Sequence, residues 1–111
     1  MKFTPGDVVL VDLGDASRGN EQAGVRPAVL VSEEGSVVIL IPLSSNVARL
    51  RFKGTVRIAP SESNKLVKPS VALVFQLRAV DSRRLLHRIG SLAPSEKRAI
   101  NEMLRSVASI K

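Results

Sequence analysis

The stretch from residue 27 to residue 42 reads PAVLVSEEGSVVILIP, two apolar runs joined by a short polar turn. Both runs are rich in valine, leucine and isoleucine without alternating polar residues, a pattern typical of strands buried on both faces. The Glu-Glu-Gly-Ser sequence at residues 33–36 suits a tight turn. We therefore predict a buried hairpin, with strands at residues 27–32 and 37–42.

Further strands and one helix are predicted outside this hairpin. Residues 7–13 (DVVLVDL) follow a Pro-Gly break and are rich in β-branched residues, and residues 70–77 (SVALVFQL) form another apolar run. Residues 94–110 carry apolar side chains at helical spacing, with Pro94 in the first turn and Glu96 favourable near the N-terminus. Short strands with one terminal amphipathic helix predict a mainly β (α+β) fold, a small curved sheet or open barrel.

Basic and apolar residues alternate in the segment RLRFK at residues 49–53. In an extended strand this period of two puts Arg49, Arg51 and Lys53 on one face and the apolar pair on the other. The basic face fits two interpretations, a solvated face that protects a sheet edge or a surface that follows the phosphates of a nucleic acid.

Length and composition bound the protein class. At 111 residues the chain is predicted to form one domain, residues 1–111. Seventeen Lys and Arg against ten Asp and Glu give a net charge of +7, which favours a polyanionic partner, such as nucleic acid or an acidic protein segment. The chain has three Phe and no Tyr or Trp, so it offers few aromatic rings on which bases could stack. Phosphate contacts and hydrogen bonds would therefore carry nucleic-acid binding.

The sequence lacks several residue types and patterns, and this excludes cysteine-dependent sites and argues against a membrane or exported protein. Without Cys, the chain has no disulfide, thiolate zinc site or Cys nucleophile. No apolar window approaches the roughly 18 residues that span a bilayer, and a Pro-Gly break interrupts the N-terminus before a signal-like segment. We therefore expect a soluble, cytoplasmic protein without a membrane partner.

Most enzyme templates are missing from the sequence. His87 is the single histidine, so a mechanism with paired imidazoles is excluded. No His, Asp and Glu residues have metal-ligand spacing, and neither a P-loop nor a nucleophile elbow is present. We expect no metal and no cofactor.

The polar segment GNEQAGVRP at residues 19–27 ends in Arg26 and Pro27, directly before the first strand of the hairpin. Its side chains suit transphosphorylation of RNA, because RNA supplies its own nucleophile, the ribose 2′-OH, beside the phosphate. The protein then needs to hold the geometry and neutralise the charge that develops on the phosphorane, for which an arginine fork is well suited.

Two blocks of the sequence resemble the MazF/PemK family of toxin endoribonucleases. The first is GDVVLVDLG followed by GNEQAGVRPAVLVS, with the signature Glu-Gln-x-Gly-x-Arg-Pro at residues 21–27, and the second is SVALVFQLRAVDSRRL. The positions that match the family are Glu21, Gln22, Gly24, Arg26 and Pro27 in the first block, and Gln76, Arg78, Asp81, Arg84 and Leu85 in the second. The resemblance covers essentially the whole chain.

The resemblance implies a fold, an activity and partners. It implies an SH3-like small open barrel with a C-terminal amphipathic helix, assembled as a homodimer. The implied toxin cleaves single-stranded RNA at a short sequence without a metal, leaves a 2′,3′-cyclic phosphate and a 5′-hydroxyl, and so inhibits translation and growth. An acidic antitoxin would occupy the same groove.

The resemblance also implies site residues. The family's catalytic pair maps to Arg26 and to Ser44, where the family usually has Thr, with Ser45 as the alternative hydroxyl. Glu21 is the nearby carboxylate able to accept the 2′-OH proton. The candidate RNA-binding residues are Asn20, Gln22, Ser45, Asn46, Arg49, Arg51, Lys53, Gln76 and Arg78. Phe75 stands where the family often has an acidic residue.

Two alternatives of other classes remain open from the sequence. A gyrase poison of the CcdB type shares the barrel, but such proteins end in Trp-Gly-Ile, whereas this chain has no Trp and ends in Ala-Ser-Ile-Lys. A catalytically silent SH3-like binding module would keep the same signature.

Overall fold

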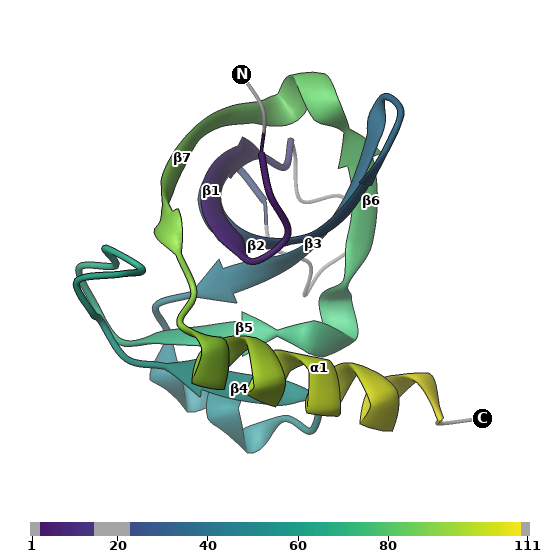
Figure 1. Ribbon diagram of the computed structural model, residues 1–111. Coiled ribbons are helices and arrows are strands. Elements are labelled where there is room, and N and C mark those ends of the chain that lie inside the picture. The colour runs from purple at the N-terminus through teal and green to yellow at the C-terminus, as the bar shows by residue number, and fades with distance from the viewer. Residues whose placement is uncertain (1–2, 15–22, 110–111) are drawn as a thin grey trace.

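The computed structural model describes residues 3–14 and 23–109, in which antiparallel strands curl into a half-barrel beside one α-helix (Figure 1). Three short 3-10 helices (η) connect some of the strands. The strands are β1 (Asp7–Asp12), β2 (Val25–Glu34), β3 (Val37–Ser44), β4 (Thr55–Ile58), β5 (Ser70–Leu73), β6 (Arg78–Asp81) and β7 (Leu85–Ser91). The helices are η1 (Val47–Arg51), η2 (Val74–Gln76), η3 (Ser82–Arg84) and α1 (Pro94–Ala108).

The predicted hairpin is confirmed and lies at the centre of the sheet. Strands pair in the order β4-β5-β3-β2-β1-β7, and β6 pairs separately with β3. Both hairpin strands extend beyond the predicted residues, and the register between them shifts after Leu30. Such an irregularity bends a strand, which fits the curl of the sheet in Figure 1.

Alternate side chains of the central strands pack into two different cores. Leu30 and Leu40 belong to a cluster with residues of β1 and β6, whereas Val29 and Ile41 belong to a cluster that includes Ile100 of α1. The prediction that the hairpin is buried on both faces is therefore confirmed. A one-residue slip of β2 would exchange the residues of the two cores, so its register is strongly specified.

Helix α1 is the predicted terminal helix and lies along β4 and β5 in Figure 1. Pro94 is its first residue, and the carboxylate of Glu96 accepts a 2.8 Å hydrogen bond from the backbone N–H of Ala93. Ile100 is buried, and its neighbours at helical spacing, including Met103, pack on the same core. No helix in residues 3–14 or 23–109 is long and apolar enough to cross a membrane.

Two predicted strands are wrong in part. Residues 49–51 are not extended, because η1 occupies residues 47–51 and the Asn46 side chain accepts a 3.1 Å hydrogen bond from the N–H of Ala48. This local bond offers the backbone an alternative to a sheet ladder, so the predicted single basic face does not form. The predicted strand at residues 70–77 ends early, because η2 interrupts it.

Candidate functional site

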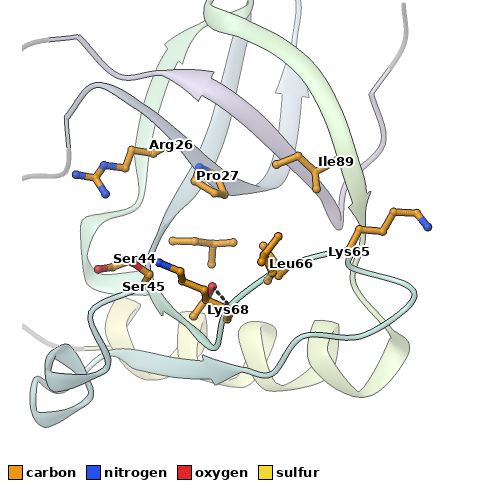
Figure 2. Close-up of a pocket in the computed structure, with 11 residues that line it drawn as sticks. Arg26, Pro27, Ser44, Ser45, Lys65, Leu66, Lys68 and Ile89 are labelled. Atoms are coloured by element: carbon orange, nitrogen blue, oxygen red, sulfur yellow. Dashed lines mark hydrogen bonds between the residues drawn. The ribbon is translucent and has the colours of Figure 1, made fainter.

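A cavity of about 260 Å³ lies where the start of β2, the end of β3 and the loop before β5 meet (Figure 2). Apolar side chains line much of it, and polar groups come from three separate segments. The apolar lining includes Pro27, Leu43, Leu66 and Ile89. The polar residues that line it are Arg26, Ser44, Ser45, Lys65, Lys68 and Ser70. The sequence-predicted pair Arg26 and Ser44 is therefore brought to one pocket.

Arg26 is the second residue of β2 and pairs with Val11 of β1, so a strand fixes its backbone. The side chain is exposed, and its Nε donates a 3.0 Å hydrogen bond to the carbonyl of Ala23. In Figure 2 the guanidinium lies at the same end of the pocket as Ser44 and Ser45. Since a guanidinium carries five N–H donors, this contact can orient the group while other donors bind an anion.

Two backbone hydrogen bonds close a neck beside Arg26. The N–H of Leu13 donates to the carbonyl of Gly24 at 2.8 Å, and the N–H of Gly24 donates to the carbonyl of Gly14 at 2.7 Å. Both glycines have positive φ, which other residues adopt with strain. Residues 15–22 connect the two sides of this neck, and they include the predicted site residues Asn20, Glu21 and Gln22, which lie outside the described residues.

Ser44 is the last residue of β3 and pairs with Val71 of β5. Its side chain is buried, with 5% of the residue exposed, and its hydroxyl accepts a 3.1 Å hydrogen bond from the N–H of Asn46. A hydroxyl that accepts one bond can also donate its own proton. Ser45 is exposed and lines the same pocket, so the structure leaves both hydroxyls at the site.

The other predicted RNA-binding residues lie outside this pocket. Asn46, Arg49 and Arg51 line a separate cavity of about 180 Å³ beside Phe52. The guanidinium carbon of Arg51 lies 5.0 Å from the centre of the Phe52 ring, a cation–π contact. Lys53 is exposed after η1. Gln76 ends η2 and Arg78 begins β6, and both are half-buried.

Sequence reasoning missed two lysines of the pocket. Lys65 and Lys68 belong to the loop between β4 and β5, which carries no catalytic motif. Their spacing in a polar loop resembles that of ordinary surface residues, and only the tertiary fold brings the loop opposite Arg26. No signal in the sequence alone distinguishes Lys68 from other exposed lysines.

Titratable groups give two further facts about the chain. Asp81 caps η3, and its two carboxylate oxygens accept hydrogen bonds from Nε and Nη2 of Arg83 at 3.1 and 2.9 Å. Hydrogen bonds from Arg83 lower the pKa of Asp81 from 3.8 to about 2. In the described ranges, 3–14 and 23–109, no group of three or more His, Cys, Asp or Glu residues could hold a metal ion.

Comparison with known proteins gives a family match and relatives that are similar in sequence. Residues 4–108 match the sequence model of the family described as PemK-like, MazF-like toxin of type II toxin-antitoxin system. An endoribonuclease MazF of Staphylococcus saprophyticus is 30% identical over 104 residues, which cover 89% of this chain and 85% of the relative.

Solved structures share the fold at low sequence identity. MazF from Deinococcus radiodurans superposes with a TM-score of 0.76 at 21% identity, covering 95% of this chain and 94% of the other. The Mycobacterium tuberculosis toxin MazF-mt6 gives 0.74 at 18% identity, with 95% and 98% covered. A mycobacterial endoribonuclease, solved in complex with its cognate antitoxin, gives 0.67 at 19% identity, with 96% and 93% covered.

Proposed function

The chain belongs to the PemK-like, MazF-like family of type II toxin–antitoxin systems and is a toxin endoribonuclease of that family, and from this we propose that it cleaves single-stranded RNA in the pocket of Arg26 and Ser44. The observation that carries the proposal is that these two residues, 18 positions apart in sequence (44 − 26), line one cavity. The family match favours a nuclease over a CcdB-type gyrase poison.

The proposed reaction is transphosphorylation within the RNA. The ribose 2′-oxygen attacks the adjacent phosphorus as the bond from phosphorus to the 5′-oxygen breaks, which gives a 2′,3′-cyclic phosphate and a 5′-hydroxyl. One proton leaves the 2′-OH and another reaches the departing 5′-oxygen. Because the nucleophile is part of the substrate, the enzyme contributes alignment and charge stabilisation rather than a covalent intermediate, and we propose that it needs no metal ion.

The pocket residues take distinct roles in this proposal. The Arg26 guanidinium donates to the non-bridging oxygens, whose charge grows in the transition state. The Ser44 hydroxyl, fixed by the N–H of Asn46, donates to the same phosphate or to the leaving oxygen. Glu21 is the candidate base for the 2′-OH proton, and Ser45 is the alternative hydroxyl. Arginine is a poor base at neutral pH, so Arg26 is assigned to charge stabilisation.

RNA on either side of the cleaved bond would be held by the other predicted residues. The cavity of Asn46, Arg49 and Arg51 offers two guanidinium groups and an amide for the phosphate of one nucleotide. The further proposed contacts are Asn20, Gln22, Lys53, Gln76 and Arg78. The net charge of +7 supports binding of the polyanion.

An acidic antitoxin is the proposed protein partner. One structural neighbour, the mycobacterial endoribonuclease, was solved in complex with its cognate antitoxin, and the basic composition of this chain suits an acidic segment. A segment that covers Arg26 would compete with RNA for the same cations. We propose that toxin and antitoxin meet in the cytoplasm, where the RNA substrate is.

A homodimer is proposed from the apolar surface around η1 and η2. Large apolar side chains there are 37–49% exposed, and the rings of Phe52 and Phe75 lie 6.2 Å apart between centres. The residues of this apolar patch are Val47, Leu50, Phe52, Phe75 and Leu77. Clustered exposed apolar groups typically mark an interface.

The test of the function is cleavage of a long single-stranded RNA by the purified protein in EDTA, with cut sites mapped by primer extension. We expect cuts at one short sequence, cyclic-phosphate ends, and no cut where the nucleotide 5′ of the broken bond is 2′-deoxy. Arg26→Ala should lower the rate about 10²–10³-fold, whereas Arg57→Ala, an exposed arginine on β4, should not. Cleavage of the 2′-deoxy RNA would contradict the mechanism, and a folded protein that cuts no RNA would be a silent binding module.

A further inference from the structure

Lys68 stands on the wall of the pocket opposite Arg26. In Figure 2 its ammonium is directed towards the end of the pocket where Ser44 and Ser45 lie, whereas the side chain of Lys65 points away. The carbonyl of Lys68 accepts a 3.1 Å hydrogen bond from the hydroxyl of Ser70, which lines the same pocket. Two cations from different segments therefore line the same pocket as the buried hydroxyl of Ser44.

The loop that carries Lys68 is fixed by the fully buried side chain of Asn64. Its Oδ1 accepts hydrogen bonds of 3.0 Å from the backbone N–H groups of Ser61 and Leu66. Its Nδ2 donates to the carbonyl of Ala59 at 2.9 Å and to the carboxylate of Glu96 on α1 at 3.2 Å. These four hydrogen bonds fix the backbone of residues 59–66, which leads into Lys68.

A second set of contacts ties the same loop to β7. The Ser63 hydroxyl donates to the carbonyl of Ser91 at 2.6 Å, and the N–H of Ser91 donates to the carbonyl of Ser63 at 3.0 Å. Gly90 lies so close that an added Cβ would be 2.6 Å from the carbonyl oxygens of Ser63 and Asn64. The loop is therefore held from β7 and α1 as well as from within.

An ordinary structural role does not account for the Lys68 ammonium. Across residues 3–14 and 23–109, the ion pairs are Arg83 with Asp81 and Arg88 with Asp7, and neither involves Lys68. Among the described residues that line the pocket none carries a carboxylate, so the Lys68 ammonium is suited to an anionic ligand. The pocket already holds the arginine and hydroxyl assigned to a phosphate.

We infer that Lys68 is a third catalytic residue, whose ammonium binds the non-bridging oxygens of the scissile phosphate opposite Arg26. This inference rests on the proposed function of the pocket. As the 2′-oxygen bonds to phosphorus, the phosphorane gains negative charge, and Arg26 and Lys68 neutralise it from two sides. Lys68 keeps its proton throughout, so the proton balance of the reaction is unchanged. Its contribution is charge stabilisation in the transition state.

The experiment compares Lys68→Met with Lys97→Met, since both remove one exposed lysine charge at similar side-chain length, but Lys97 lies on α1 and does not line the pocket. Two quantities are measured on an RNA containing the mapped cut site: the single-turnover cleavage rate at saturating enzyme, and the Kd for the same RNA with a 2′-deoxy nucleotide at the cut. We expect Lys68→Met to lower the rate at least tenfold and to raise the Kd at most threefold. Lys97→Met should stay within twofold on both, and Lys68→Arg should recover part of the rate.

The outcomes separate this inference from the proposed function. A wild-type protein that does not cut RNA refutes the function itself. A wild-type protein that cuts, with Lys68→Met cutting within threefold of it, refutes only the role of Lys68. A third result would also overturn it: an unchanged cleavage rate, weaker RNA binding, and a slope of log Kd against log salt concentration that is smaller than in the wild type by about 0.7. Lys68 would then contact a phosphate next to the scissile one. If Lys68→Met loses its cooperative thermal unfolding, Lys68→Gln is measured by the same criteria.

Discussion

Single residues of the site differ in how far sequence can place them. The resemblance to the MazF/PemK family assigns both Arg26, which lies in a local signature, and Ser44, which follows an apolar run. Lys68 has neither kind of signal. Its position depends on Asn64, whose four side-chain hydrogen bonds reach as far as Glu96 on α1. Contacts over such separations are set by the tertiary fold, which local patterns do not encode.

The two adjacent serines give a test at this scale. Ser44 is buried and held by the N–H of Asn46, whereas Ser45 is exposed. A pre-oriented donor contributes more to a transition state than one that must be ordered. We expect Ser44→Ala to lower the cleavage rate about 10–100-fold and Ser45→Ala less than fivefold, both measured under single-turnover conditions. The reverse order would assign the catalytic hydroxyl to Ser45.

Asp81 gives a pH-dependent test away from the pocket. Hydrogen bonds from Arg83 lower its pKa from 3.8 to about 2 in the folded state. A group with a depressed folded pKa stabilises the fold above its unfolded pKa, and this stabilisation is lost as the pH falls from about 4 to about 2. NMR titration of the Asp81 carboxyl should show the low pKa, and Arg83→Ala should raise it. A midpoint near 3.8 in the wild type would show that the ion pair does not form in solution.

At the scale of elements, apolar runs predicted structure better than charge alternation did. The hairpin and α1 were assigned correctly, because their residues bury whole faces in the two cores. The alternation at residues 49–53 failed, because the segment has no buried residue and the cap at Asn46 decides its backbone. A periodic pattern specifies a strand only where one face is buried.

Gly90 of β7 gives a prediction about how closely elements pack. A methyl group there would meet the carbonyls of Ser63 and Asn64 at 2.6 Å, so Gly90→Ala must displace the loop. We expect the free energy of unfolding to fall by about 1–3 kcal/mol. Gly35→Asn is the matched control, because nothing lies within 4 Å of an added Cβ and Asn tolerates the positive φ there. Equal stability of wild type and Gly90→Ala in urea would show that the loop moves freely.

For the whole molecule, the apolar patch of Val47, Leu50, Phe52, Phe75 and Leu77 predicts self-association. Phe52→Ser should shift the mass in sedimentation velocity from twice 12.0 kDa towards 12.0 kDa, because it removes one ring of the pair at 6.2 Å. Leu86→Ser, on β7 and 49% exposed, should leave the mass unchanged. A wild-type protein that sediments as a monomer would refute the homodimer.

The neck at Gly14 and Gly24 has a consequence for how such a protein diversifies. Its two backbone hydrogen bonds isolate the sheet from changes of length or sequence in the chain between the two glycines. Insertions between the two glycines therefore leave the pairing of β1 with β2 in place, while they change the sequence that precedes Arg26. Natural variation can accumulate there faster than in the strands, and new target preferences can arise on an unchanged catalytic frame.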